Sequence, residues 1–167
     1  LPTLSRADNT HIAEAQVYVD KHFPSNYGST SDFIFPVSHR SARKWFAHFL
    51  RTRLDNFGTY QDAIHTDNDF GFHSCLSSSI NCGLIAPVDI IAQIRPWKGR
   101  VKLNSYEGYI RQLFWREYQR YCYIYFDFSK KKNYFGNTKK LTKAWYEGTT
   151  GCDPVDDCIQ RGFAQGY

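Results

Sequence analysis

Three residues suited to binding a flat, charged ligand share one face of a predicted helix. The stretch LNSYEGYIRQLFWREYQRYCYIYF, residues 103–126, has helical spacing throughout. At about 100° per residue, Gln112, Trp115 and Arg116 lie on the same side. A guanidinium offers forked donors to a phosphate or carboxylate, and an indole offers a flat stacking surface. The plainer alternative is an exposed arginine beside a partly buried tryptophan, and the pattern alone leaves both open.

The opposite side of this helix has the composition of a core. Its residues are Tyr106, Ile110, Leu113, Phe114, Tyr121, Ile124 and Tyr125. Glu117 falls inside this apolar stripe, where a carboxylate needs a hydrogen-bonding or charged partner. We expect a structural role for Glu117, with Arg43, Arg51 or Arg53 of an earlier helix as its partner.

The segment HSCLSSSINCG, residues 73–83, is a second candidate site. Its hydroxyls lie near the start of a short helix predicted over about 74–82, which Gly83 would end. Free N–H groups and the helix dipole at such a start suit a phosphate, and hydroxyls add donors. The GxxxxGK spacing of a nucleotide-binding loop is absent. Serines at a helix start are most often simple caps, so this signal is weak by itself.

Composition and charge allow a polyanionic partner. The 167 residues suffice for one domain with a core, and 17% of them are aromatic, which favours stacking or a ring-rich core. Net charge is +5, but residues 95–143 hold thirteen Lys/Arg against three acidic residues, a local +10. Clustered cations bind phosphates. The alternative is a solvated basic loop around residues 130–132.

Several classes of protein are disfavoured. Five cysteines without a CxxC pair suit reduced thiols in an intracellular protein, nuclear or cytoplasmic, and we expect no metal site. No run of about 18 apolar residues and no signal peptide is present, so no membrane partner is expected. The chain begins with Leu and contains no Met, which suggests a piece of something longer. No catalytic triad or paired-carboxylate site is evident, so any enzymatic chemistry would belong to a bound cofactor.

The helical spacing and capping signals predict an all-α fold in a single domain over residues 1–167. Helices are expected over about 10–20, over 39–56 with Ser38 as the cap and Gly58 as the end, from Pro87, over 139–147, and from Asp153 to the end of the chain. The helix over 39–56 carries an apolar stripe of Ala42, Trp45, Phe46, Phe49, Leu50 and Leu54. Asn104 and Glu107 predict a capping box for the long helix.

Four ordered blocks give these segments a specific likeness. They are FPVSHRSARKWFAHFLRTRLDNFGTYQDAI at 35–64, HSCLSSSINCGLIAP at 73–87, LNSYEGYIRQLFWREYQRY at 103–121 and WYEGTTGCDPVDDCIQRGFAQGY at 145–167. Together they resemble the helical FAD-binding domain of the photolyase and cryptochrome family, in the form typical of photolyase-related proteins. The antenna-binding α/β domain and the later C-terminal helices of that family are not matched, so the resemblance implies a partial FAD-binding domain, incomplete at both ends.

The resemblance implies roles for individual residues. Tyr60, His73, Ser74, Leu76, Ser77, Gln112 and Arg116 correspond to FAD-binding positions, although many members have Thr where His73 stands. Trp115 and Gln112 correspond to the catalytic wall, with Trp115 packing against an extruded pyrimidine pair. The implied function is light-driven, FAD-dependent repair of pyrimidine photoproducts in DNA, by a monomeric lyase whose partner is damaged DNA with a flipped lesion. The alternatives are a cryptochrome-like blue-light photoreceptor and a flavin-free helical DNA-binding module.

Overall fold

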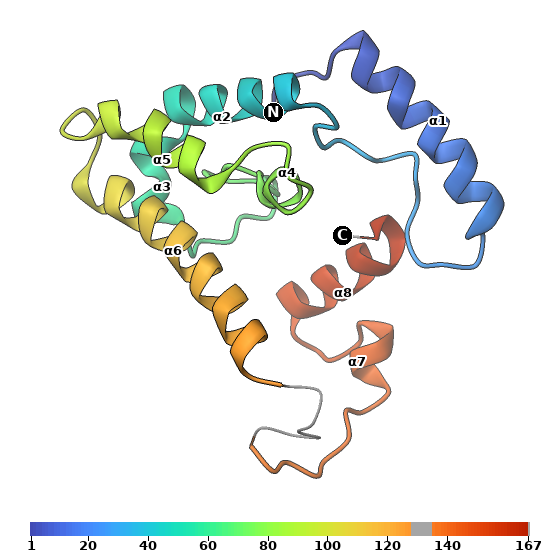
Figure 1. Cartoon of the computed structure of the whole chain (residues 1–167). Helices are drawn as coiled ribbons and strands as arrows, with labels where there is room; N and C mark the ends of the chain where they lie inside the picture. Colours follow the sequence, from blue (N-terminus) through green and yellow to red (C-terminus); the bar gives the residue numbers. More distant parts are fainter. Residues whose placement is uncertain (128–134, 167) are drawn as a thin grey trace. The chain divides into compact units, whose positions relative to one another are not determined.

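The computed structural model describes residues 1–127 and 135–166, and over these residues all regular structure is helical (Figure 1). The all-α prediction is therefore confirmed. The helices are α1 (Arg6–His22), α2 (His39–Thr52), α3 (Leu54–Tyr60), α4 (Ser77–Asn81), α5 (Pro87–Ile94), the 3-10 turn η1 (Arg95–Trp97), α6 (Leu103–Tyr125), α7 (Ala144–Glu147) and α8 (Asp153–Gln165). The basic loop predicted around residues 130–132 lies outside the described residues.

The chain divides into two compact units. Unit 1 comprises Leu1–Asp8 and Phe35–Asp127, and unit 2 comprises Asn9–Ile34 and Phe128–Tyr167. The boundary between Asp8 and Asn9 falls inside α1, so the first turn of that helix belongs to unit 1. A single domain over residues 1–167 stays a prediction.

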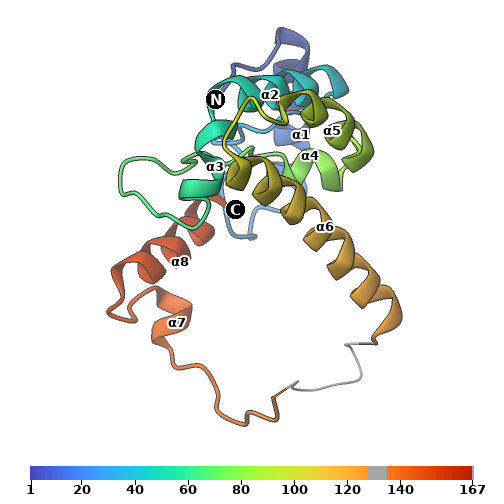
Figure 2. The ribbon, with the colours of Figure 1, turned by 90° about the vertical axis from the view of Figure 1, so that its left-hand side faces the viewer.

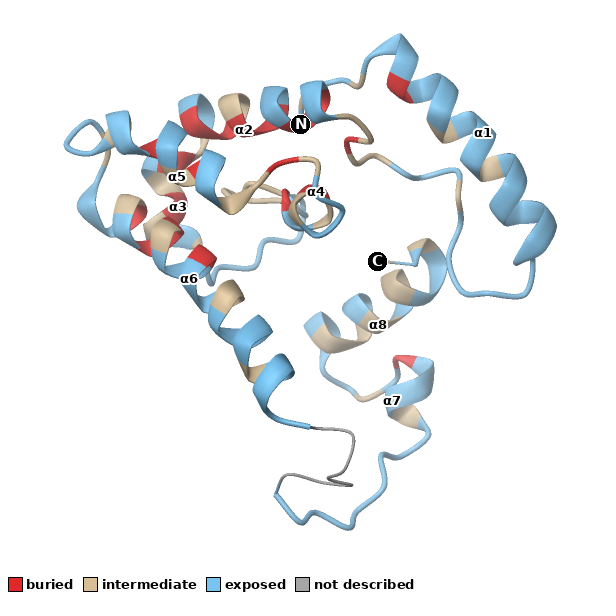
Figure 3. Cartoon of the chain, viewed as in Figure 1, coloured by how far each residue is buried: buried red, intermediate tan, exposed pale blue. Residues whose placement is uncertain are grey.

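The core of unit 1 is built around α2. The predicted stripe is confirmed, since all six of its residues are buried: Ala42, Trp45, Phe46, Phe49, Leu50 and Leu54. Ser38 caps the helix as predicted, with its side chain accepting from the amide of Ser41 at 3.3 Å. Phe49 packs edge-on against Phe57 and lies 4.7 Å, between ring centroids, from Tyr109. Figure 3 shows this burial concentrated on α2, α3, α5 and the first turns of α6.

A glycine lets α3 pack tightly against the start of α6, and the two helices lie side by side in Figure 2. A Cβ on Gly58 would lie only 2.5 Å from the backbone of Asn104. Ser105, fully buried, bridges the helices by donating to the carbonyl of Asp55 at 2.8 Å and accepting from the amide of Gly58 at 2.9 Å. The prediction that Gly58 ends a helix is therefore wrong, because this residue serves a close approach inside α3.

The start of α6 also differs from the sequence prediction. The helix begins at Leu103, and Asn104 lies within its first turn, so the predicted capping box does not form. The N-cap residue Lys102 makes no side-chain cap. Instead, the carboxylate of Asp55 on α3 accepts from the Lys102 amide at 2.9 Å. A partner from another helix thus replaces the local cap.

Burial along α6 corrects the two-face interpretation. The buried residues are Ser105, Gly108, Tyr109 and Leu113, all in the first half of the helix. Helical spacing puts Gly108 and Tyr109 on the same face as Gln112 and Arg116, yet Tyr109 is only 4% exposed and belongs to the core. Phe114, Tyr121, Ile124 and Tyr125, expected in the core, are 68%, 59%, 70% and 76% exposed. The prediction was wrong because the core covers the first half of the helix rather than one stripe along its whole length.

The N-terminal segment is fastened to α2 through a buried carboxylate. Asp8, 1% exposed, accepts from the hydroxyl of Ser5 at 2.5 Å and from the hydroxyl of Ser41. The backbone carbonyl of Pro2 accepts from the indole of Trp45 at 3.2 Å, and that of Thr3 accepts from Lys44 at 3.2 Å. Asp8 therefore sits at the N-terminus of α1 and beside the N-terminus of α2, where helix dipoles favour negative charge.

Unit 2 is organised by loops more than by a core. α1 is longer than the expected 10–20, and the helix expected over 139–147 is confined to Ala144–Glu147. The predicted start of the last helix is confirmed, with Pro154 in the first turn of α8. The ring of Tyr27 packs on that of Phe163 at 4.7 Å between centroids, and the amide of Gly28 donates to the Phe163 carbonyl at 2.8 Å.

Candidate functional site

The serine-rich segment is anchored to the junction of α2 and α3. The guanidinium of Arg53 donates to the carbonyl of His73 at 2.9 Å, and the His73 ring meets Phe57 edge-on at 5.9 Å. Cys75 adopts a φ of 55°, a left-handed conformation that is uncommon for a residue with a side chain. Leu76 then inserts into the core, with 1% of its surface exposed. After this turn α4 begins at Ser77, three residues later than the start at about residue 74 that the sequence predicts.

Ser74 lies beside the buried phenol of Tyr109. Burial raises the pKa of Tyr109 to about 12, although the nearby Ser74 hydroxyl lowers it. The phenol consequently stays protonated at neutral pH. Ser74, predicted to bind cofactor, therefore lies beside a core residue of α6.

Arg116 reaches the end of the same segment. Its guanidinium donates to the side-chain oxygen of Asn81, the last residue of α4, at 2.9 Å, and pairs with Glu117. Arg120 also pairs with Glu117, at 2.9 Å. Glu117 is therefore held by arginines of its own helix, and the expectation of a partner on α2 was wrong. The carboxylate orients Arg116, which brings this cation and the serine segment together.

The remaining predicted site residues are more exposed. Trp115 is 54% exposed and stacks on Tyr118, with 5.3 Å between ring centroids and 27° between planes. Gln112, one turn earlier on α6, is exposed. Tyr60, at the end of α3, is 47% exposed and stacks on Phe72 at 5.1 Å. The roles of all eight predicted residues stay predictions, because the structure joins Arg116 to Asn81 of α4 and places Ser74 beside Tyr109 without showing what they bind.

Three buried polar atoms near these residues lack hydrogen-bond partners among the described residues. They are the Oγ atoms of Ser78 and Ser79 and the Oε1 atom of Gln61. Ser79 is fully buried in α4, next to the segment that Arg116 contacts. The side chain of Gln61 lies beside Gly108 of α6. A Cβ added to Gly108 would be 3.7 Å from the Oε1 atom of Gln61. Unsatisfied buried donors and acceptors are rare in native proteins. The two hydroxyls can donate or accept, whereas the Gln61 oxygen only accepts. With the Arg116 cation, these atoms fit a ligand that carries phosphate together with hydrogen-bond donors and acceptors, as FAD does.

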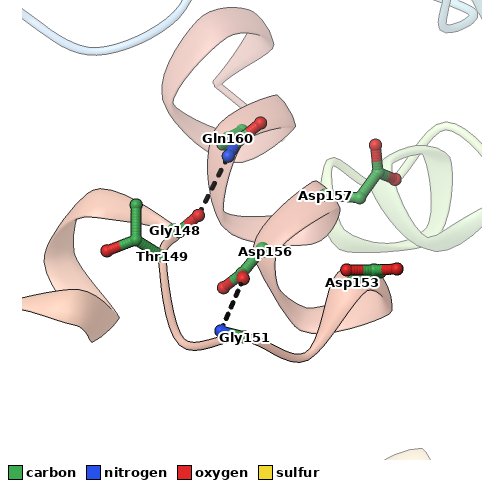
Figure 4. A pocket seen from close by; sticks show the side chains of 7 residues that line it. All are labelled: Gly148, Thr149, Gly151, Asp153, Asp156, Asp157 and Gln160. Carbon is green, nitrogen blue, oxygen red and sulfur yellow. Dashed lines mark hydrogen bonds between the residues drawn. The ribbon is translucent and has the colours of Figure 1, made fainter.

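Unit 2 contains a separate polar hollow between α7 and α8 (Figure 4). The carboxylate of Asp156 organises its rim by accepting from the amide and hydroxyl of Thr150, both at 2.7 Å, and from the amide of Gly151 at 3.0 Å. Burial opposes the charge of Asp156, but these hydrogen bonds together prevail and lower its pKa. Gln160 closes the other side by donating to the carbonyl of Gly148 at 2.9 Å. The hollow is shaped by capping interactions of the turn.

Within residues 1–127 and 135–166, no group of three or more His, Cys, Asp or Glu side chains could hold a metal ion. Among these same residues, no helix is both long enough and apolar enough to cross a bilayer.

Sequence reasoning missed three residues that shape the candidate site. Asn81 is the partner of Arg116, Arg53 holds the carbonyl of His73, and Gln61 presents an unsatisfied oxygen. Asn81 and Gln61 lie within the blocks that carry the family likeness, so their polar character was visible. What the sequence did not carry was the pairing between α6 and α4, which depends on tertiary packing.

Fold and site together define an all-helical chain in which an arginine of a long helix meets a serine-rich turn. It is 36% identical over 157 residues to a (6-4) photolyase of Agrobacterium fabrum, covering 89% of this chain and 30% of that protein. The chain therefore spans less than a third of the photolyase. No protein-family model matches the chain.

The alignment with a second relative covers a larger share of that protein. The chain is 42% identical over 110 residues to an uncharacterized protein of Acanthamoeba polyphaga mimivirus, covering 64% of this chain and 85% of that protein. The chain belongs to the same family as this viral protein.

Proposed function

We propose that the chain forms part of the FAD-binding, catalytic domain of a light-driven DNA repair lyase of the photolyase type. Support comes from the similarity to the (6-4) photolyase over 89% of the chain and from the all-helical fold. When bound, a reduced flavin would supply a light-excited one-electron donor for a pyrimidine photoproduct. The substrate would be damaged DNA with the lesion flipped out of the duplex, since flipping costs least at an unstacked, damaged base.

The observation that carries the proposal is the meeting of Arg116 with α4. Two features that were weak separately, a cation on α6 and a run of serines, are joined by the 2.9 Å bond to Asn81. Arg116 would hold a cofactor phosphate through its forked donors. Glu117 would orient the guanidinium, and Ser77 with the unsatisfied hydroxyls of Ser78 and Ser79 would supply further hydrogen bonds.

Trp115 and Gln112 would form the wall for the lesion. Both are exposed on α6 next to Arg116, and an exposed indole is a suitable stacking surface for an unpaired base. Tyr60 and His73 would complete the cofactor side, because both are exposed on unit 1 and lie at the two ends of the loop between α3 and α4. These residues would bind and position, and the chemistry would come from the cofactor.

Flavin retention by two arginine variants tests the cofactor assignment. The purified 167-residue chain is mixed with FAD, desalted, and its flavin absorbance compared with that of Arg116→Ala and Arg120→Ala. Each variant removes one partner of Glu117, but only Arg116 contacts Asn81. We expect Arg116→Ala to retain at most about a tenth of the wild-type flavin, in line with loss of a charge-assisted bond, and Arg120→Ala to stay close to wild type. Equal flavin in both variants would contradict the assignment.

Binding and repair assays separate the lyase from its alternatives. Trp115→Ala should weaken binding of an oligonucleotide with a pyrimidine photoproduct by roughly tenfold, the value of one stacked base, while flavin content is unchanged. If the chain is part of a photolyase, illumination of that whole protein should restore the damaged oligonucleotide. Flavin without restoration would favour a photoreceptor of the cryptochrome type, and DNA binding without flavin would favour a flavin-free module.

A further inference from the structure

The second half of α6 exposes a stripe of aromatic rings that the cofactor site does not use. Phe114, Tyr118, Tyr121 and Tyr125, here called the tyrosine stripe, are 68%, 57%, 59% and 76% exposed. At about 100° per residue they fall within about 60° of one another, on a single face of the helix. They extend over roughly 16 Å of helix axis. Contiguous exposed apolar surface of this kind marks an interaction site more often than an ordinary surface.

The rings are already arranged as stacking platforms. Tyr121 and Tyr125 lie 6.2 Å apart between centroids, with only 11° between their planes. Tyr118 stacks on Trp115, so the stripe continues directly from the residue proposed to contact the lesion. Near-parallel, solvent-facing rings in a row offer flat surfaces to consecutive bases.

Composition and charge indicate whether the tyrosine stripe binds another helix or a nucleic acid. A seam for a second helix, including that of another copy, is usually built from Leu, Ile and Val, whereas all four stripe residues are aromatic and three carry a hydroxyl. Arg111 lies on the same face, is exposed, and makes no ion pair with any described residue. Residues 95–127 carry seven Lys/Arg against three acidic residues, a net charge of +4. Cations beside exposed rings fit a polyanion that has flat bases.

We infer that the tyrosine stripe binds single-stranded DNA, undamaged included, by stacking unpaired bases on Tyr118, Tyr121 and Tyr125 while Arg111 contacts the phosphate backbone. The inference rests on the proposed function in that both take DNA as partner, but it concerns a different surface and requires no flavin. The stripe would hold the strand that runs on from a flipped lesion at Trp115. It would therefore add affinity that does not depend on the photoproduct.

Fluorescence anisotropy with a labelled, undamaged oligo(dT) tests this surface, in the dark and without added FAD. Tyr121→Ala and Tyr125→Ala should each weaken binding on the order of tenfold, whereas Tyr121→Phe, which keeps the ring, should bind within about twofold of wild type. Tyr123→Ala is the matched control, since Tyr123 is 79% exposed on the opposite side of the same helix and should not change affinity. Arg111→Ala should reduce the salt slope of binding by about 0.7.

Three outcomes would overturn the inference. They are no binding of oligo(dT) by the wild-type chain, equal losses in Tyr123→Ala and Tyr121→Ala, or sedimentation showing a dimer that Tyr121→Ala converts to monomer without any oligo(dT) binding. In the last case the stripe would be the interface with a second copy of the chain. If oligo(dT) binds as expected while flavin retention and photorepair both fail, the proposed lyase function fails and the stripe assignment stands.

Discussion

Asp8 shows how a single buried carboxylate fastens the N-terminal segment to α2 within unit 1. Burial opposes its charge, but hydrogen bonds from Ser38, Ser41 and Ser5 prevail and hold the pKa of Asp8 well below its ordinary value. A carboxyl group with a lowered folded-state pKa contributes stability that is present above the unfolded-state pKa, about 3.9, and is lost as pH falls through the acid range. The chain should therefore lose stability on acidification partly through this one residue.

Asp8→Asn tests this contribution. At pH 7 the variant should lower the free energy of unfolding by about 1–3 kcal/mol, because charge-assisted hydrogen bonds are replaced by weaker ones. Between pH 5 and about pH 3 the wild type should lose stability faster than the variant. Urea unfolding followed by circular dichroism measures both effects. Asp62→Asn, at an exposed aspartate, is the control, and the same pH dependence in wild type and Asp8→Asn would count against the argument.

At the scale of elements, Gly58 determines how closely α3 and α6 approach. Gly58→Ala should destabilise the chain by about 1–3 kcal/mol, as expected for overpacking, even though alanine is the better helix former by about 1 kcal/mol. The reason is that the new Cβ would meet backbone atoms of Asn104, 2.5 Å away, which cannot move independently of α6.

The control for Gly58→Ala is a glycine in open space. Gly162 lies within α8, and a Cβ there would meet nothing within 4 Å. Gly162→Ala should therefore leave stability unchanged or raise it by up to about 1 kcal/mol. Opposite signs for the two variants in thermal unfolding are the expected result, and a stabilising Gly58→Ala would show that the helices separate more easily than their packing suggests.

Elements with strong local signals were predictable from the sequence, and pairings between elements were not. Helical periodicity and capping preferences were enough to predict features that depend on residues close in the chain. These are the apolar stripe of α2, its Ser38 cap and the start of α8 at Asp153. The buried half of α6 depends on where α3 packs, which periodicity does not encode. The same holds for the site, where Arg116 was found from its helix face but its partner Asn81 belongs to another element.

At the scale of the whole molecule, the two compact units differ in how much they bury. Among the residues that the structure describes, thirteen form the buried hydrophobic core, and all of them belong to unit 1. In unit 2, the described residues of α7 and α8 include no buried side chain, and their order comes from turns such as the one capped by Asp156. Local stability follows buried apolar contact, so the units should open with different free energies.

Native-state hydrogen exchange tests this difference along the chain. Amides of α2 should exchange only through global unfolding, whereas amides of α8 should exchange through local openings that cost at least about 2 kcal/mol less, since surface-exposed elements draw on the low end of the stability range. Phe49→Ala, which removes a fully buried ring, should lower the α2 protection by about 3–5 kcal/mol and leave that of α8 nearly unchanged. If α8 instead matched α2 in the wild type and lost protection with it in Phe49→Ala, the chain would unfold as the single domain that its sequence predicts. The two units would then be subdivisions of one cooperative structure.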